Sequence, residues 1–150
     1  MITQQLINPA SIVIVGGSND TTKPGGKVLK NLIDNHFGGS LFVVNPKEDF
    51  IQGIKCNKTV DELPQCDLAI LAIAAKYCPD TVEKLARDKQ TRAFIILSAG
   101  FHEESAEGAA LEEQIVATVN QYGACLIGPN CIGMMNHHHT SVFTTPIPKL

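Results

Sequence analysis

The chain has 150 residues, of which 44% are hydrophobic and 18% are charged, and its formal net charge at pH 7 is −3. This length and composition predict one globular domain with a single core. The acidic balance excludes a general attraction to nucleic acid or to a membrane surface, so any anionic ligand must be held by a local group of donors.

The first predicted elements are a strand, a helix and a second strand. A continuous apolar run at 11–15 predicts a buried strand that ends at Gly16 and Gly17. After a polar loop, Gly25 and Gly26 open a predicted helix, and a second apolar run predicts a strand at 40–44. The apolar stripe of this helix consists of Val28, Leu29, Leu32 and Ile33.

The same alternation continues to residue 127. A turn-rich segment with a weak helical signal at 60–63 leads to a predicted strand at 67–73, and further strands are predicted at 93–97 and 124–127. Pro79 suits the first turn of one intervening helix, while Ser105 suits the N-cap of the other and Gly123 suits its end. The expected apolar stripes of these two helices are Val82, Leu85 and Ala86, and Leu111, Ile115, Val116 and Val119.

This pattern predicts an α/β fold with a doubly wound, Rossmann-like parallel sheet. Apolar runs that scarcely alternate are typical of strands covered on both faces, and the intervening helices predict right-handed crossovers. We expect five strands in the order 3-2-1-4-5. From Gly128 onward the periodicity is lost, so we expect a domain at 1–133. Residues 134–150 should be an irregular tail that starts a linker to downstream domains.

In such a sheet, ligands bind beyond the carboxyl ends of the strands. Four lysines fall at this edge of an acidic chain, namely Lys23, Lys27, Lys47 and Lys76. Together with the glycine-flanked start of the first helix, they predict a site for a phosphorylated ligand. The candidate binding residues, strand by strand, are Gly17, Ser18, Asn19, Asp20, Thr21, Gly25, Gly26 and Lys27; Asn45, Pro46 and Lys47; Ala74 and Lys76; Ser98, Ala99 and Gly100; and Pro129 and Asn130.

A nicotinamide dinucleotide fits these loops poorly. The usual Gly-x-Gly-x-x-Gly turn is missing, and no acidic residue ends the second strand to bind the ribose hydroxyls. Lys47 stands there instead and favours a nucleotide with an additional phosphate, as in coenzyme A (CoA). A fragment of an NAD(P)-dependent oxidoreductase is therefore the weaker alternative.

Five motifs resemble those of the N-terminal CoA-binding domain of NDP-forming acyl-CoA synthetases. That family includes ADP-forming acetate–CoA ligase and is similar to the alpha subunit of succinyl-CoA synthetase. The resemblance covers nearly the whole chain, and five motifs in register are quite specific, although the segment 19–23 carries extra residues. The motifs are Val15-Gly16-Gly17-Ser18, Pro24-Gly25-Gly26-Lys27-Val28, Val44-Asn45-Pro46-Lys47, Ser98-Ala99-Gly100-Phe101 and Gly128-Pro129-Asn130-Cys131-Ile132-Gly133.

The resemblance implies a binding role without turnover for this chain alone. The loop 18–21 with the two glycines and Lys47 would hold the nucleotide end of CoA, residues 98–100 would line the pantetheine path, and Asn130 would lie near the reacting thiol. No catalytic residue is expected in this chain. The whole enzyme would join a short acid such as acetate to CoA through an acyl phosphate and a phosphohistidine. MgATP or MgADP would be bound outside this chain, by downstream α/β and ATP-grasp domains or by a partner subunit. The alternative is a free-standing CoA-binding or CoA-sensing module.

Other chemistry is weaker. Five cysteines without a Cys-x-x-Cys pair predict neither disulfides nor a zinc site, and with no apparent export signal or membrane span they favour the cytoplasm. The run 137–139 of three histidines is expected in a solvated or interdomain loop rather than at a metal. Cys131 is expected to be a small buried turn residue rather than a nucleophile. We expect a structural role rather than an acid–base role for three acidic residues near the start of the last helix, where a negative charge interacts favourably with the helix dipole. They are Glu103, Glu104 and Glu107.

Overall fold

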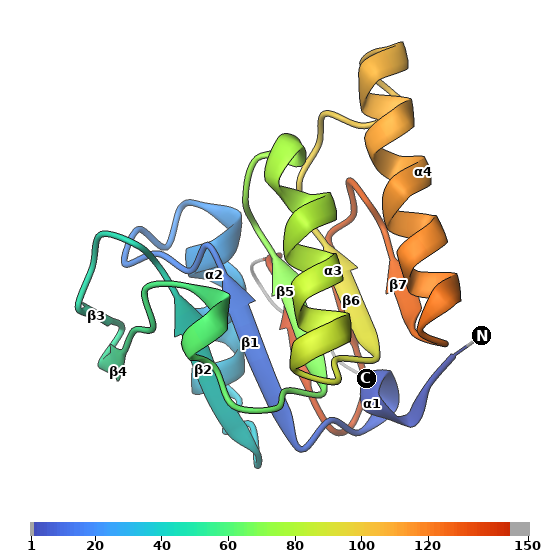
Figure 1. The fold of residues 1–150 in the computed structure, drawn as a ribbon. Coiled ribbons are helices and arrows are strands. Elements are labelled where there is room, and N and C mark those ends of the chain that lie inside the picture. Colours follow the sequence, from blue (N-terminus) through green and yellow to red (C-terminus); the bar gives the residue numbers. More distant parts are fainter. Residues whose placement is uncertain (1, 145–150) are drawn as a thin grey trace.

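Five parallel strands form the central sheet of the computed structural model, which describes residues 2–144 (Figure 1). Each strand lies within one of the five apolar runs, so the predicted doubly wound α/β sheet is confirmed. The inner strands β1, β5 and β6 pair on both sides, and their side chains alternate between the two faces of the sheet, both of which are apolar. The strands are β1 (Ser11–Val15), β2 (Ser40–Val44), β5 (Leu68–Leu71), β6 (Ala93–Ile96) and β7 (Cys125–Ile127).

The position of the first strand differs from the expected order. The sheet runs β2-β1-β5-β6-β7, so the first strand lies between the second and the third and pairs in parallel with both. The connection from β2 returns across β1 and carries the hairpin β3 (Phe50–Ile51) and β4 (Ile54–Lys55) and a 3-10 helix at Val60–Glu62. Apolar runs show that a strand is buried but not which strand is its neighbour. The winding therefore reverses between β1 and β5.

Helices cover both faces of the sheet. In Figure 1, α3 (Cys78–Asp88) and α4 (Ala106–Gln121) lie in front of the sheet and α2 (Pro24–Asp34) lies behind it. Alternate residues of β1 supply the two cores: Val13 and Val15 pack with the α3 side, and Ile12 and Ile14 pack with the α2 side. None of the helices within residues 2–144 is both long and apolar enough to cross a bilayer.

The helix boundaries largely follow the expected signals. Pro79 lies in the first turn of α3, the Ser105 hydroxyl accepts the Gly108 amide at the start of α4 (2.9 Å), and Gly123 follows the end of α4 with a positive φ. The expected α4 stripe was too wide, because Val116 is 41% exposed. The helix packs over the last strand of the sheet, and nothing in the described part of the chain lies beyond β7 to cover that side chain.

Residues 133–142 form a second hairpin where we expected an irregular tail. Its strands are β8 (Gly133–Met135) and β9 (Thr140–Val142), and β9 packs on α2. The buried Asn31 side chain of α2 donates to the Val142 carbonyl (2.7 Å), and the Thr140 hydroxyl donates to the Asn31 carbonyl (3.0 Å). Strands of three residues are too short for a period to show in the sequence. Residues 145–150, where the linker was expected to continue, lie outside the described residues.

The last histidine of the run joins this hairpin to the short helix α1 (Gln4–Ile7). His139 is buried, its Nε2 lies 2.7 Å from the Leu6 carbonyl, and its Nδ1 lies 2.6 Å from the Ser141 hydroxyl. These partners suit a neutral ring that donates from Nε2 and accepts at Nδ1. Burial, with a smaller effect of His138, lowers the pKa of His139 below its usual value.

This buried ring predicts a loss of stability in mild acid. Below pH ~6.5 His139 is protonated in the unfolded chain, whereas burial keeps it neutral in the folded chain. The free energy of unfolding therefore decreases as the pH is lowered. Urea unfolding at pH 7.5 and 5.5 should show a larger loss for the wild type than for His139→Gln, by at most about 1.4 kcal/mol per pH unit. The raised pKa of His102 acts in the opposite direction but is common to both proteins. Equal losses would contradict the assignment to His139.

Candidate functional site

The loops that follow the parallel strands meet at the upper edge of the sheet in Figure 1. A hollow of about 190 Å³ lies there, at the point where the winding reverses, and we call it the switch-point pocket. Its walls come from the start of α2 and from the loops after β1, β5 and β6. The lining residues are Gly16, Ser18, Lys23, Pro24, Gly25, Ala72, Leu97 and Ser98.

Two glycines allow the start of α2 to approach the end of β1. Gly16 has φ +91°, and a Cβ on it would lie 2.5 Å from the Ala72 carbonyl oxygen. A Cβ on Gly25 would lie 2.3 Å from the carbonyl oxygen of Gly16. No side chain fits at either position, so backbone atoms form this wall of the pocket.

The start of α2 has no side-chain cap. Lys23 is the N-cap residue, its side chain makes no capping hydrogen bond, and Pro24 follows in the first turn. A lysine cannot accept hydrogen bonds from the amide groups of the first turn. This 11-residue helix therefore presents its positive end beside a cationic side chain, which is an arrangement that suits an anion.

The polar residues of the loop after β1 bind mainly to one another. The Ser18 hydroxyl accepts the Asp20 amide (3.0 Å), and the Asp20 carboxylate accepts the Thr22 amide (3.0 Å) and hydroxyl (2.6 Å). The bonds from Thr22 hold the pKa of Asp20 below its usual value. Asp20 thus shapes the loop, and a charged carboxylate is poorly suited to contact a phosphate directly. Thr21 is exposed at the tip.

Sequence reasoning missed the hairpin that supports this loop. The Gln52 side chain donates to the carbonyls of Ser18 (3.0 Å) and Gly26 (2.9 Å), and Asn19 bonds to the hairpin in return. The sequence did contain a signal, because Gln52-Gly53 separates two short segments that each contain an apolar residue. In the structure both turn residues have positive φ, as a two-residue hairpin turn requires. The hairpin therefore belongs to the site.

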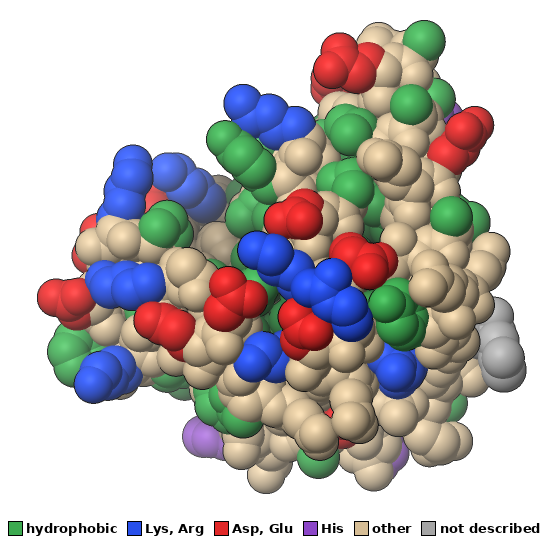
Figure 2. Space-filling model, in the orientation of Figure 1, with side chains coloured by type: hydrophobic (Ala, Val, Ile, Leu, Met, Phe, Trp, Pro, Cys, Tyr) green, Lys and Arg blue, Asp and Glu red, His purple; other side chains and the backbone are tan. Residues whose placement is uncertain are grey.

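The four edge lysines form no salt bridge within the described residues. Elsewhere Lys30, Lys58 and Lys84 each pair with a carboxylate. Lys76 lies over the ring of Tyr77, with its ammonium 5.1 Å from the ring centroid. Figure 2 shows blue side chains of lysine or arginine at the upper left, near the start of α2 in Figure 1, with acidic side chains beside them. Among the described residues, the cations that an anion would meet there form no ion pair with a carboxylate.

The Asn45 side chain fixes the backbone from which Lys47 extends. Its amide donates to the Gly17 carbonyl (3.1 Å), and its carbonyl oxygen accepts the Lys47 amide (2.8 Å). The intervening Pro46 is exposed, as is Lys47 itself. Gly17 is buried against β2, where a Cβ would lie 2.6 Å from Val43, so its role is close packing rather than ligand contact. Lys27 lies half-buried in the first turns of α2.

The loops after β6 and β7 are tied together at the other end of the pocket. The Ser98 hydroxyl donates to the Ile73 carbonyl, and the Asn130 amide donates to the Ser98 carbonyl (2.9 Å). The Glu103 carboxylate accepts the Gly100 amide (2.7 Å), and bonds of this kind lower its pKa. Ala99 and Ala74 are exposed, and Pro129 is half-buried. This end of the site is neutral or acidic rather than basic.

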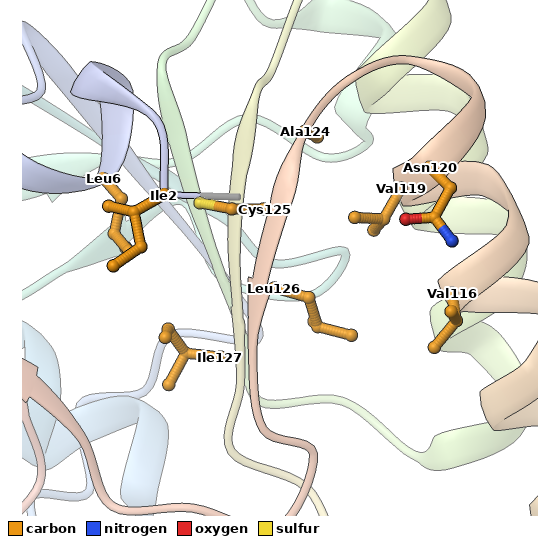
Figure 3. Close-up of a pocket in the computed structure, with 9 residues that line it drawn as sticks. All are labelled: Ile2, Leu6, Val116, Val119, Asn120, Ala124, Cys125, Leu126 and Ile127. Atoms are coloured by element: carbon orange, nitrogen blue, oxygen red, sulfur yellow. The ribbon is translucent and has the colours of Figure 1, made fainter.

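The other candidates remain outside this site. Burial raises the pKa of Cys131, whose half-buried thiol contacts the Ile96 carbonyl (3.4 Å), so it is a poor nucleophile. His137 and His138 are exposed beside His36, in a polar hollow at the opposite edge of the sheet. A further hollow lies along the free edge of β7 and against α4, and Figure 3 shows mostly aliphatic side chains lining it.

Comparison with known proteins agrees with these observations. A protein-family model described as a CoA binding domain matches residues 10–137. The chain is 39% identical, over 87% of its length, to the alpha subunit of ADP-forming acetate–CoA ligase II of Pyrococcus furiosus, and covers 28% of that protein. It is 37% identical, over 89% of its length, to a trans-feruloyl-CoA synthase of an unknown prokaryotic organism, and covers 19% of it.

The fold also resembles that of a solved structure. The dinucleotide-forming acetyl-coenzyme A synthetase 1 of Ca. Korarchaeum cryptofilum, solved with phosphate and ADP, superposes with a TM-score of 0.87 at 27% identity. The match covers 98% of this chain and 32% of that one. The chain thus spans less than a third of the length of each of these proteins.

Proposed function

This chain belongs to the CoA-binding domain family, and we propose that it binds CoA at the switch-point pocket as part of an ADP-forming acyl-CoA synthetase. The observation that carries the proposal is the group of lysines without carboxylate partners around the uncapped start of α2. CoA carries three phosphate groups, which such a rim attracts, whereas an unphosphorylated ribose would gain little from Lys47.

The charge distribution suggests how CoA lies. Lys23, Lys27 and Lys47 would bind the phosphates at the β2 end of the pocket, aided by the first amides of α2. The pantetheine arm would pass Ser98 and Gly100, close to the loop of Ala74 and Lys76, toward the loops after β6 and β7. Asn130 would then lie near the thiol.

The reaction of the whole protein would require parts outside this chain. We propose that MgATP or MgADP binds to downstream α/β and ATP-grasp domains or to a partner subunit, and that the acyl group is acetate or another short acid. Support comes from the acetate–CoA ligase relative, which is longer than this chain. The free thiols of all five cysteines support a reducing, cytoplasmic location.

Titration calorimetry of the 150-residue chain tests the proposal. We expect CoA and acetyl-CoA to bind with one site per chain and NAD to give no heat. The distinction follows from the lysine at the end of β2, which replaces the acidic residue that binds a dinucleotide ribose. Heat with NAD and none with CoA would reverse the assignment.

A further inference from the structure

One large aromatic side chain stands exposed on the hairpin beside the pocket. Phe50 is 60% exposed, whereas its neighbour Ile51 is fully buried in the core on the α2 side. Successive side chains of a strand point to opposite faces, so the anchoring of Ile51 sends the Phe50 ring outward. Lys55 pairs with Phe50 across the hairpin, which places an ammonium group and an aromatic ring on the same face.

The hairpin has a fixed position relative to the loop after β1. The Asn19 side chain donates to the Phe50 carbonyl (3.2 Å) and accepts the Gln52 amide (2.8 Å). The Gln52 side chain donates back to the Ser18 and Gly26 carbonyls, at the start of the pocket. These bonds therefore fix the backbone of the hairpin relative to the residues that would bind phosphate.

The size of the pocket requires a further contact surface. Pockets that enclose a drug-sized ligand have about 300–1,000 Å³, whereas the switch-point pocket has about 190 Å³. It can enclose only part of CoA, so the rest of the ligand must contact residues outside it. The lysines at the β2 end would bind the phosphates there, and among the described residues the exposed aromatic side chain on the neighbouring hairpin is Phe50.

The second exposed aromatic ring is less suited to a base. Tyr77 lies on the other side of the pocket, after β5, and Lys76 already covers one face of its ring. Among the described residues no cation is found over the ring of Phe50. A free ring face on a rigid element is what stacking with a nucleobase requires.

We propose that Phe50 stacks against the adenine base of CoA and that hairpin 50–55 is the base-binding element of this domain. The proposal rests on the proposed function, since it presupposes that CoA binds. Lys55, on the same face, would meet a phosphate of the same nucleotide. The ligand feature recognised here is an adenine ring next to a phosphorylated ribose.

A single tryptophan reports on this contact, because the chain has none. We expect the fluorescence of Phe50→Trp to be quenched by CoA and by adenosine 3′,5′-bisphosphate, but not by 4′-phosphopantetheine, which lacks the base. Ile7→Trp, at an exposed position on α1, is the matched control and should not respond. In calorimetry, Phe50→Ala should weaken CoA binding about fivefold or more, while Phe50→Tyr should retain it.

The outcomes separate this proposal from the proposed function. If the wild type binds CoA but Phe50→Ala binds equally well, or if Phe50→Trp shows no quenching, base stacking is overturned and CoA binding stands. If the wild type itself gives no heat with CoA, the proposed function fails first. Equal quenching by phosphopantetheine would assign Phe50 to the other arm of CoA and also overturn the proposal.

Discussion

Gly25→Ala is expected to lower the free energy of unfolding by about 1–3 kcal/mol and to reduce CoA binding at least tenfold. Helix propensity alone predicts the opposite, since alanine is better than glycine inside a helix by about 1 kcal/mol. The new Cβ would lie 2.3 Å from the Gly16 carbonyl oxygen and 3.2 Å from the Ala72 Cβ. Backbone must therefore move, and α2 must shift away from the end of β1. Urea unfolding and calorimetry measure the two effects.

Gly38→Ala is the matched control. A Cβ at Gly38 meets no atom within 4 Å, and its φ lies outside the left-handed range. This variant should unfold within about 0.5 kcal/mol of the wild type and bind CoA with unchanged affinity. If Gly25→Ala were as stable as Gly38→Ala, close packing of α2 on β1 would not be the reason for a glycine at this position.

Much of the fold could be predicted because its central strands are buried on both faces. Ile12, Val13 and Ile14 are all fully buried, and such continuous burial leaves an unbroken apolar run in the sequence. The neighbours of β1 could not be predicted, since they depend on the path of the connection after β2. The hairpins were missed for a different reason: strands of two or three residues are too short to show a period, and only the turn at Gln52-Gly53 marked the first of them.

The location of the site was easier to predict than the role of each residue. Ligands bind where strands end and the winding reverses, so the loops could be named in advance. The partners of Asn19 and Asp20 could not, because one side chain bonds to a hairpin more than 30 positions away and the other to its own loop. Polar side chains in loops give the same sequence signal whether they bind a ligand or the protein itself.

The unpaired lysines should account for most of the electrostatic affinity for CoA. Lys47→Ala is expected to weaken binding about tenfold or more, as for the loss of one charge-assisted contact. Lys23→Glu combined with Lys47→Glu should abolish measurable binding, because carboxylates would then face the phosphates. The loss for Lys47→Ala should shrink at high salt, where exposed charges are screened. Calorimetry at low and high ionic strength checks both expectations.

A second double variant separates local contacts from overall charge. Lys30→Glu combined with Lys84→Glu changes the net charge by the same amount but lies away from the pocket, at lysines that already pair with carboxylates. Breaking such exposed pairs has little effect on stability. CoA should bind this control almost as well as the wild type, since only lysines at the carboxyl edge of the sheet can reach the phosphates. Equal losses in the two double variants would mean that CoA responds to the overall charge of the chain, and the lysine rim would then define no site.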